Sequence, residues 1–265
     1  MTTETKEDQI LKFQKECFSK IKNYPNDHDW LCTSRAWLRK AFEHKFMYNF
    51  NWLDRPIIQI PNDILAMQEI IWEIKPDLVI ETGIAHGGSL IMSASMLALL
   101  DMCDAIESNH SINPRESKRK VLGIDIDIRA HNKEAIETHP MSSRIQMIEG
   151  SSISDDVISQ VHDVASKYNT VLVCLDSNHT HDHVLAELNA YSGLTTVNSY
   201  CVVFDTIVED MPAEMFPDRP WGPGNNPKTA VWEFLKDHPE FQIDKDTQNK
   251  LLITVAPDGF LKRIS

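Results

Sequence analysis

The sequence predicts an α/β fold: a mostly parallel sheet with helices on both faces, closed by an antiparallel pair of strands and preceded by a helical N-terminal extension. From residue 62 onward, short apolar runs alternate with segments of helical spacing, which is typical of parallel strands joined by helices. A glycine-rich segment follows the first run, and acidic residues follow several others. We therefore assign residues 1–61 to the extension and residues 62–265 to the sheet domain.

The expected elements of the sheet domain alternate along the chain, with a polar insertion at residues 101–118. The last two apolar runs are expected to pair as the antiparallel closure. Strands are expected at Leu78–Ile80, Val121–Ile126, Ile145–Ile148, Val171–Leu175, Tyr200–Phe204, Phe241–Ile243 and Leu251–Val255, and helices at Asp63–Lys75, Leu90–Leu100, Ala130–Thr138, Asp155–Tyr168, His183–Tyr191 and Pro227–Asp237.

The N-terminal extension carries two patterned segments. Residues 9–22 have helical apolar spacing, and residues 30–52 are rich in aromatic side chains. One interpretation is a lid that roofs a ligand site on the main domain. The other is ordinary core packing, because aromatic side chains dominate buried area in any protein.

Composition restricts the class of protein. The chain has 265 residues, 42% of them hydrophobic and 25% charged, as in ordinary globular domains. Its net charge of -13, with no basic stripe, argues against a nucleic-acid partner. We expect no membrane span and no signal peptide. The five cysteines lack C-x-x-C spacing, so we expect reduced thiols and a cytoplasmic location.

The glycine-rich segment after the first strand points to a cationic ligand. Its spacing is G-x-x-x-G-G, which differs from the dinucleotide fingerprint, and no P-loop motif occurs in the chain. Glu81 lies inside this segment, where it would repel a pyrophosphate and attract the ammonium and sulfonium groups of S-adenosylmethionine. We expect Thr82, Gly83, Gly87 and Ser89 to take part, with Ser89 as the helix N-cap. The alternative is that the glycines serve packing alone.

Acidic residues end four of the predicted strands. They are Glu81, Asp125, Asp176 and Asp205, and the carboxyl ends of parallel strands share one ligand-binding edge. An acid at the end of the second strand can accept hydrogen bonds from both ribose hydroxyls of an adenosine. Asp125 is therefore the predicted ribose ligand, and Asp176 is expected beside the cofactor.

Asp176 and Asp205 end neighbouring strands, so we expect them to share a divalent ion such as Mg²⁺. Three histidines follow Asp176 at positions 179, 181 and 183, which also permits a transition metal. His179 is the predicted general base, with Asp176 beside it in the catalytic site, because the ordinary pKa of histidine suits proton removal at neutral pH. His181 and His183 are expected to support the site or to begin the next helix.

Seven motifs follow one another between residues 52 and 264. They are Glu81-Thr82-Gly83-Ile84-Ala85-His86-Gly87-Gly88-Ser89, Gly123-Ile124-Asp125-Ile126-Asp127, Gly150-Ser151-Ser152, Leu175-Asp176-Ser177-Asn178-His179, Asp205-Thr206, Arg219-Pro220-Trp221-Gly222-Pro223-Gly224-Asn225-Asn226-Pro227 and Ala256-Pro257-Asp258-Gly259-Phe260-Leu261. Through these motifs the chain resembles the cephalosporin hydroxylase/rhamnosyl O-methyltransferase family. Members of this family resemble class I S-adenosylmethionine-dependent methyltransferases with a Rossmann-like sheet, and several methylate sugar hydroxyls with Mg²⁺.

The resemblance also implies residue roles. It assigns Glu81, Gly83 and Ser89 to the methionine end of the cofactor, Asp125 to the ribose, and Ser151 and Ser152 to the adenine. It assigns Asp176 and Asp205 to the metal and His179 to the base. Metal-binding relatives often have Glu-Asp where this chain has Phe204-Asp205. Water, Asp182 or Glu209 is the expected replacement for the absent carboxylate.

The predicted function is S-adenosylmethionine-dependent, Mg²⁺-assisted O-methylation of a sugar or related small polyol, in surface polysaccharide or natural-product biosynthesis. Two alternatives keep the same fold. One is a hydroxylase or hydroxylase component, in which His179, His181 and Asp176 would imitate a facial triad. The other is a non-catalytic cofactor-binding subunit, which Phe204 favours. The expected partners are a small-molecule or saccharide acceptor and further copies of the chain in a homo-oligomer.

Overall fold

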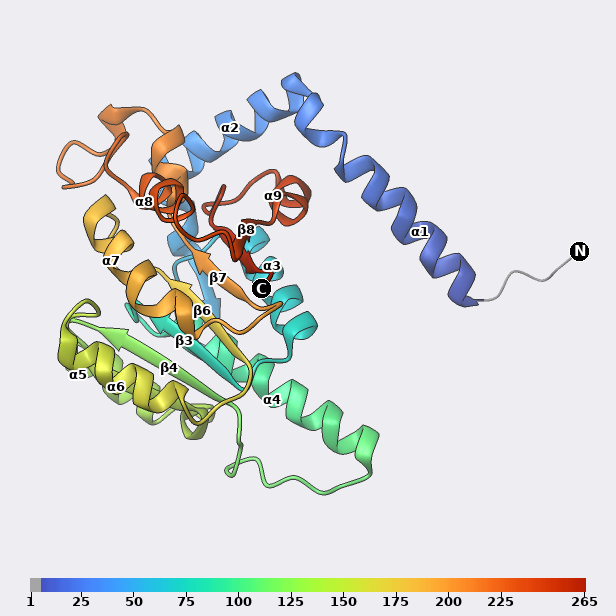
Figure 1. Ribbon diagram of the computed structural model, residues 1–265, viewed down its shortest axis with the longest axis vertical. Helices are drawn as coiled ribbons and strands as arrows, with labels where there is room; N and C mark the ends of the chain where they lie inside the picture. Colours follow the sequence, from blue (N-terminus) through green and yellow to red (C-terminus); the bar gives the residue numbers. More distant parts are fainter. Residues whose placement is uncertain (1–5) are drawn as a thin grey trace, which may run out of the picture.

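The computed structural model describes residues 6–265 and confirms the α/β fold (Figure 1). Seven strands form the main sheet in the order β5-β4-β3-β6-β7-β9-β8. The five strands β3 to β7 run parallel, whereas β9 pairs antiparallel with both β7 and β8. The strands are β3 (Leu78–Thr82), β4 (Lys120–Asp125), β5 (Ile145–Glu149), β6 (Val171–Leu175), β7 (Tyr200–Val203), β8 (Phe241–Ile243) and β9 (Phe260–Arg263).

Strand β3 lies between β4 and β6, and the strand order reverses at this position. A reversal of this kind opens a crevice at the carboxyl ends of the strands, where α/β sheets bind ligands. The residues that follow β3, β4, β6 and β7 therefore meet at one edge. These are the strand ends at which the sequence places the candidate site.

The side chains of alternating strand residues contribute to two separate hydrophobic cores. Val79 belongs to one hydrophobic cluster, whereas Leu78 and Ile80 belong to the other, as the two-residue period of a strand requires. Side chains of α3, α4, α5 and α9 contribute to the first core, and side chains of α6, α7 and α8 to the second. Both faces of the sheet are thus covered, which explains why its central strands are apolar throughout.

Helices connect the strands, with short 3-10 turns between several of them. The helix α8 begins at a capping box in which Asn226 accepts from two backbone N–H groups, and Pro227 occupies its first turn as expected. The helices are α1 (Lys6–Ile21), α2 (His28–Glu43), α3 (Pro61–Ile74), α4 (Gly88–Ser108), α5 (Ala130–Glu137), α6 (Asp155–Ala165), α7 (His181–Tyr191), α8 (Pro227–Phe234) and α9 (Lys245–Leu251).

The prediction of a strand at Leu251–Val255 is wrong. Residues 245–251 form α9, which Asp244 caps by accepting from two backbone N–H groups. Asp63 of α3 accepts a hydrogen bond from the N–H of Val255 at 2.8 Å. Leu251 and Val255 pack in the first hydrophobic core, which also contains side chains of α3. The partner of β8 is β9 instead. The predicted insertion at 101–118 is also too long, because α4 continues to Ser108.

The extension contains α1, α2 and a small hairpin of β1 (Phe50–Trp52) and β2 (Arg55–Ile57). The hairpin packs closely on the start of α4: a Cβ atom on Gly88 would lie 2.2 Å from the carbonyl oxygen of Pro56. By contrast, α1 projects away from the sheet (Figure 1). The part of the extension nearest the domain is therefore held at the candidate site.

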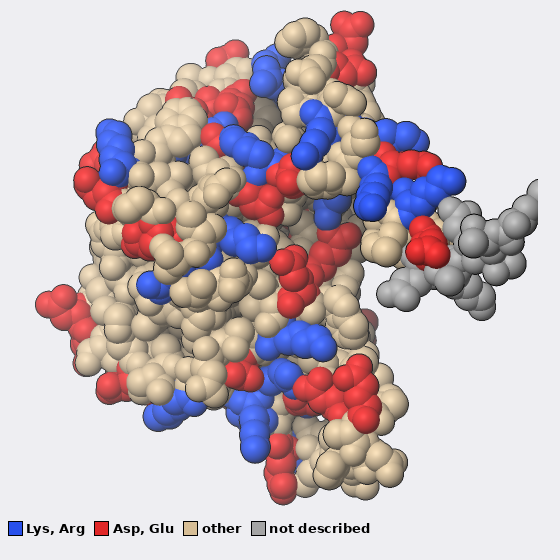
Figure 2. Space-filling view, turned by 45° about the vertical axis from the view of Figure 1, so that its right-hand side comes forward, with Lys and Arg blue, Asp and Glu red and all other residues tan. Residues whose placement is uncertain are grey.

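Within the described residues, α4 is the one helix that is long and apolar enough to cross a membrane by length and composition. Leu90, Leu97 and Leu100 of this helix are fully buried in the first core. On the face drawn in Figure 2, Lys and Arg side chains are interspersed with Asp and Glu side chains.

Candidate active site

The glycine-rich turn after β3 carries Glu81 below the protein surface. Glu81 is buried and accepts a hydrogen bond from the Ser89 hydroxyl. The prediction of Ser89 as N-cap is wrong, because α4 begins at Gly88 and its N-cap is Gly87. Ser89 instead lies in the first turn of α4 and orients the carboxylate. The turn thus presents an acid and a hydroxyl at the positive end of a helix.

The glycines of this turn are required by protein neighbours. Gly83 has a φ of +89°, and a Cβ atom there would lie 2.1 Å from the carbonyl oxygen of Asp176. Gly87 has a φ of +81°, and its Cβ would overlap the side chain of Ile136. Contacts with the protein itself therefore require glycine at both positions. Their effect is to bring the β3 turn against the end of β6.

Asp125 at the end of β4 organises the same turn. One carboxylate oxygen accepts from the backbone N–H groups of Ile84 at 2.8 Å and Ala85 at 3.3 Å. The other accepts from the N–H of Asp127 at 3.2 Å. Ile126, directly after Asp125, is 73% exposed, an unusual position for a large aliphatic side chain at a ligand-binding edge.

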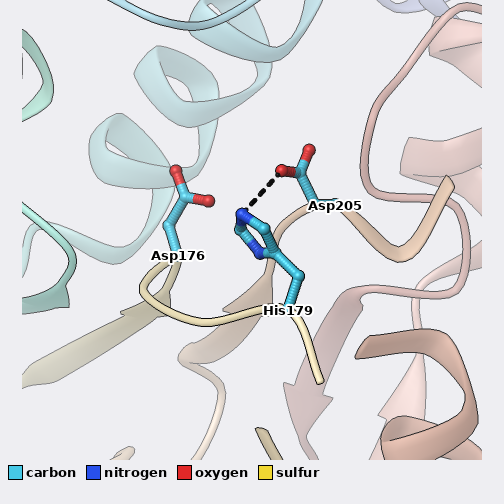
Figure 3. Close-up of side chains that lie close together, drawn as sticks. All are labelled: Asp176, His179 and Asp205. Carbon is cyan, nitrogen blue, oxygen red and sulfur yellow. Dashed lines mark ion pairs between the residues drawn. The ribbon is translucent and has the colours of Figure 1, made fainter. Parts of the chain in front are cut away.

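The structure brings Asp176, His179 and Asp205 together (Figure 3). One ligand atom of each lies within 4.8 Å of the others, and His179 Nε2 lies 3.2 Å from Asp205 Oδ2. Asp205 has a left-handed backbone with a φ of 54°, which is uncommon outside glycine and recurs at functional sites. Thr206 and the chain after it are tied to residues 255–257 by hydrogen bonds, which fixes this turn.

Two carboxylate oxygens and one imidazole nitrogen at this spacing fit a divalent ion. The carboxylates suit Mg²⁺ with water completing its coordination shell. The imidazole is also compatible with a transition-metal ion. Neither acid considered as a replacement joins the group. Glu209 accepts the N–H of Gly224 at 2.7 Å, and Asp182 is exposed at the start of α7. His179 is the third member of the group that the structure brings together.

Several carboxyl groups lie close together at this edge of the sheet. Burial raises the pKa of Glu81 to about 7, against the opposing effect of the Ser89 hydrogen bond. Burial, followed by repulsion from Asp205 and Glu81, raises the pKa of Asp176 well above its usual range. Ionised carboxylates here are costly until a cation neutralises them. The electrostatics therefore favour positively charged ligands, whether a metal ion, an ammonium or a sulfonium.

Gln59 and Arg55 of the extension make polar contacts at the site, and neither is among the residues predicted from the sequence. Gln59 Nε2 lies 3.3 Å from Asp176 Oδ2, and its Oε1 is buried without a partner. Arg55 Nε donates to the carbonyl of His86 at 2.9 Å. A polar Gln59 between Ile58 and Ile60 was the available signal, since a lone amide in an apolar run needs a partner when buried.

The other predicted residues lie at the same edge but at different depths. Ser152 is buried beside His183, with 3.1 Å between Oγ and Nε2, and Ser151 is half-buried. Thr82 is fully buried, and its hydroxyl and carbonyl accept from the N–H of Asp176. His181 turns toward α8, where Nδ1 lies 2.8 Å from the Thr229 hydroxyl.

A cavity of about 440 Å³ opens over these groups. Among the predicted site residues, Gly83, Ser89, Asp176, His179 and Asp205 line it, whereas Glu81, Thr82, Gly87, Asp125, Ser151 and Ser152 do not. The extension contributes Phe42, Lys45, Met47, Tyr48 and Gln59 to the walls, and the segment after β7 contributes Met215, Phe216, Arg219 and Trp221.

The strand order, the acid-bearing turn after β3 and the acid that ends β4 define a class I methyltransferase fold. Residues 44–264 match the model of the family described as Rhamnosyl O-methyltransferase/CmcI, and the chain belongs to this family.

Two kinds of relative accompany this match. Proteins named rhamnosyl O-methyltransferase from Mycobacterium tuberculosis and Mycobacterium leprae are 28% identical over 228 residues, which cover 83% of this chain and 83% and 88% of the relatives. A solved structure of CmcI described with Mg and SAM covers 82% of this chain and 78% of its own, with a TM-score of 0.54 and 15% identity. The apo structure of CmcI gives a TM-score of 0.52.

Proposed function

We propose that this protein is an S-adenosylmethionine-dependent O-methyltransferase that acts on a hydroxyl of a sugar or related small polyol, assisted by a divalent ion such as Mg²⁺. The biosynthesis of a surface polysaccharide or natural product is the expected setting. Family membership and the rhamnosyl O-methyltransferase relatives support the reaction. The observation that carries the proposal is the convergence of Asp176, His179 and Asp205 on the cavity that the β3 turn also lines.

The cofactor is proposed to lie along the carboxyl ends of β3, β4 and β5. Glu81 and Ser89 would contact its methionine end. Burial disfavours the ionised carboxylate of Glu81, and a cationic ligand would stabilise it. Asp125 would hold the ribose. Ser151 and Ser152 would border the adenine, and the exposed Ile126 offers an apolar surface against which an adenine ring can stack.

Asp176 and Asp205 would hold the divalent ion, which when bound lowers the pKa of an adjacent hydroxyl. His179 is proposed to accept the proton of the acceptor hydroxyl at Nε2, where Asp205 at 3.2 Å stabilises the imidazolium that forms. S-adenosylmethionine, when bound, would supply the methyl group to the hydroxyl oxygen and leave as S-adenosylhomocysteine. Gln59 holds Asp176 from the extension side.

The hydroxylase alternative loses its structural support. A facial triad of His179, His181 and Asp176 would require His181 at the cluster, yet its Nε2 lies 3.3 Å from Glu233 Oε2 on α8. The non-catalytic alternative rested on Phe204. That side chain is buried in the first core, and Asp205 still reaches the cluster beside it.

The working state is proposed to be a homo-oligomer in the cytoplasm. In support of oligomerisation, α1 projects from the domain (Figure 1) and exposes Ile10, Leu11, Phe13 and Phe18. Exposed apolar patches of this kind mark interaction surfaces. In support of the compartment, Cys174 and Cys201 are buried free thiols.

Calorimetry tests the cofactor assignment. The purified protein is expected to bind S-adenosylhomocysteine, and Asp125→Ala is expected to weaken binding by about 1.5–3 kcal/mol, the contribution of a charged hydrogen bond. Asp127→Ala, two residues away, is the matched control and should bind normally. Unchanged affinity in Asp125→Ala, or tight NADH binding in place of the sulfonium ligand, would contradict the proposal.

A further inference from the structure

The cavity has an acidic floor and a basic mouth. Its charged acidic lining consists of Asp176 and Asp205, both half-buried. Lys45 and Arg219 also line it, and both of these side chains are exposed. The cations therefore lie nearer to solvent than the carboxylates. The two charges are separated in depth, in a chain whose net charge is -13.

Neither cation is paired within the described part of the chain. No carboxylate of residues 8–265 lies within ion-pair distance of Lys45 or Arg219, whereas Lys228, Lys245, Lys250 and Lys262 each have an acidic partner. An unpaired cation at a cavity mouth in an acidic protein retains its full attraction for an anion. A neutral sugar would make no use of it.

Ring contacts fix the position of Arg219 relative to the cluster. The guanidinium lies over the Trp221 ring, 5.1 Å from its centre, and the Trp221 ring meets His179 edge-to-face at 4.9 Å between centroids. Arg219 is thus separated from the His179 imidazole by one indole. This contact leaves the guanidinium N–H groups free to bind a phosphate in the bidentate manner that suits arginine.

Lys45, from the N-terminal extension, lines the same cavity as Arg219. It occupies the turn between α2 and the 3-10 helix at Phe46–Asn49, with a left-handed φ of 51°. A lysine in this conformation is uncommon. Its N–H and carbonyl are both used in the turn, by Phe42 and Tyr48. The backbone is therefore fixed while the ammonium remains unpaired.

We infer that the acceptor carries a phosphate next to the methylated sugar, and that Lys45 and Arg219 bind this phosphate at the cavity mouth while the sugar hydroxyl lies at Asp176, His179 and Asp205. Two cations match a dianionic phosphate better than a single carboxylate. The phosphate belongs either to a sugar 1-phosphate or to a nucleoside diphosphate sugar. The inference rests on the proposed function and adds the chemical class of the acceptor.

The test compares matched ligands on the protein saturated with S-adenosylhomocysteine. Calorimetry compares the affinity for rhamnose 1-phosphate with the affinity for methyl rhamnoside, which carries a methyl group in place of the phosphate. Thymidine diphosphate rhamnose is the third probe. We expect the better phosphorylated ligand to bind at least about tenfold more tightly than methyl rhamnoside, with an affinity that falls as salt rises. Tighter binding of the nucleotide sugar than of rhamnose 1-phosphate identifies the nucleotide as the source of the phosphate.

The double variant Lys45→Gln/Arg219→Gln should remove the preference for the phosphorylated probes and leave S-adenosylhomocysteine binding unchanged. The control Lys167→Gln/Lys236→Gln loses the same charge from exposed positions outside the cavity and should keep the preference. Cofactor binding without a phosphate preference, or a preference that survives in the double variant, overturns this inference alone. Failure of wild type to bind S-adenosylhomocysteine overturns the proposed function and this inference with it.

Discussion

At the scale of single residues, the carboxyl groups of the site differ in the free energy that their ionisation requires. Glu81 is buried with a pKa raised to about 7, and a single hydroxyl is its hydrogen-bond partner. Asp125, by contrast, accepts from several backbone N–H groups. Glu81 is therefore poised to respond to a cation, whereas Asp125 holds the loop in place.

Cofactor affinity should depend on pH through Glu81. The cofactor ammonium favours the ionised carboxylate, so binding below pH 7 must first remove a proton. Affinity should rise about tenfold between pH 6 and pH 8. In the ligand-free protein the raised pKa has the opposite consequence: the stability that Glu81 contributes is complete below its unfolded pKa and is lost as pH rises through 7.

Calorimetry of S-adenosylmethionine across this range measures the effect. Glu81→Gln should bind more weakly and show a flat profile. Asp63 provides the control, because burial raises its pKa to about 7 as well while it does not line the cavity. Asp63→Asn should keep the pH dependence. A sloping profile in Glu81→Gln would assign the titration to another group.

His179 should be separable from its neighbours by kinetics. Removal of a positioned general base typically costs about 10²–10⁴-fold in rate, so His179→Ala should lose that factor in kcat while cofactor affinity is kept. His181→Ala should have a much smaller effect, because that ring is bonded to α8. Metal titration of the same variant separates the two roles: an unchanged metal affinity supports the base, and a lost affinity makes His179 a ligand.

At the scale of elements, the sequence predicts what local pattern determines. Strand β6 and the acid after it follow from an apolar run that is followed by Asp176, and the start of α8 follows from Pro227 in its first turn. Residues 251–255 have an equally strand-like composition. Their position is instead decided by the helix cap at Asp244 and by Asp63, which lies far away in the sequence. Such tertiary contacts override local propensity.

The contribution of Gln59 also depends on a tertiary contact, so it could not be predicted from local sequence pattern. Its amide meets Asp176 more than a hundred residues later in the chain, and sequence pattern alone does not reveal that approach. The direction of His179 was equally unavailable. Its residue type predicts a base or a ligand, but its place between the two carboxylates depends on the left-handed turn at Asp205.

The junction between the extension and α4 should be intolerant of a single methyl group. In Gly88→Ala the new Cβ would overlap the carbonyl of Pro56, so the hairpin must move and Gln59 with it. Gly83→Ala adds left-handed strain of about 1–2 kcal/mol to its overlap with Asp176. Gly193, which has open space around its Cβ position, is the matched control.

Urea unfolding should show clear destabilisation in Gly88→Ala and Gly83→Ala, and a change near zero in Gly193→Ala. The catalytic readout adds a second test for Gly88→Ala. If folded protein loses activity through displacement of the extension, the cavity wall is needed for turnover. Wild-type stability in Gly88→Ala would mean that the hairpin is not held against α4.

At the scale of the whole molecule, the extension divides into two parts with different tasks. The hairpin and the end of α2 complete the cavity wall. The helix α1 carries an exposed apolar stripe and projects from the domain (Figure 1). The exposure of these apolar side chains is explained if α1 packs against a second copy of the chain.

Light scattering coupled to size-exclusion chromatography should find an oligomer for the wild type. Phe13→Asp/Phe18→Asp should shift it toward the monomer, because a buried charge costs more than the stripe can offset. Ser19→Asp, on the same helix but outside the stripe, should leave the assembly intact. A monomeric wild type, or an oligomer indifferent to the double substitution, contradicts a role for α1 in assembly.

The most direct test of the account is methyl transfer from labelled S-adenosylmethionine to a sugar acceptor, measured by mass spectrometry of the product. We expect a mass increase of one methyl group on a hydroxyl oxygen in the presence of Mg²⁺. We also expect loss of the product in chelator and a greatly raised metal requirement in Asp205→Asn, with cofactor binding nearly intact. Full turnover of wild type in excess chelator would contradict the role given to Asp176 and Asp205. Label transferred to carbon, or to no sugar acceptor at all, would contradict the proposed reaction.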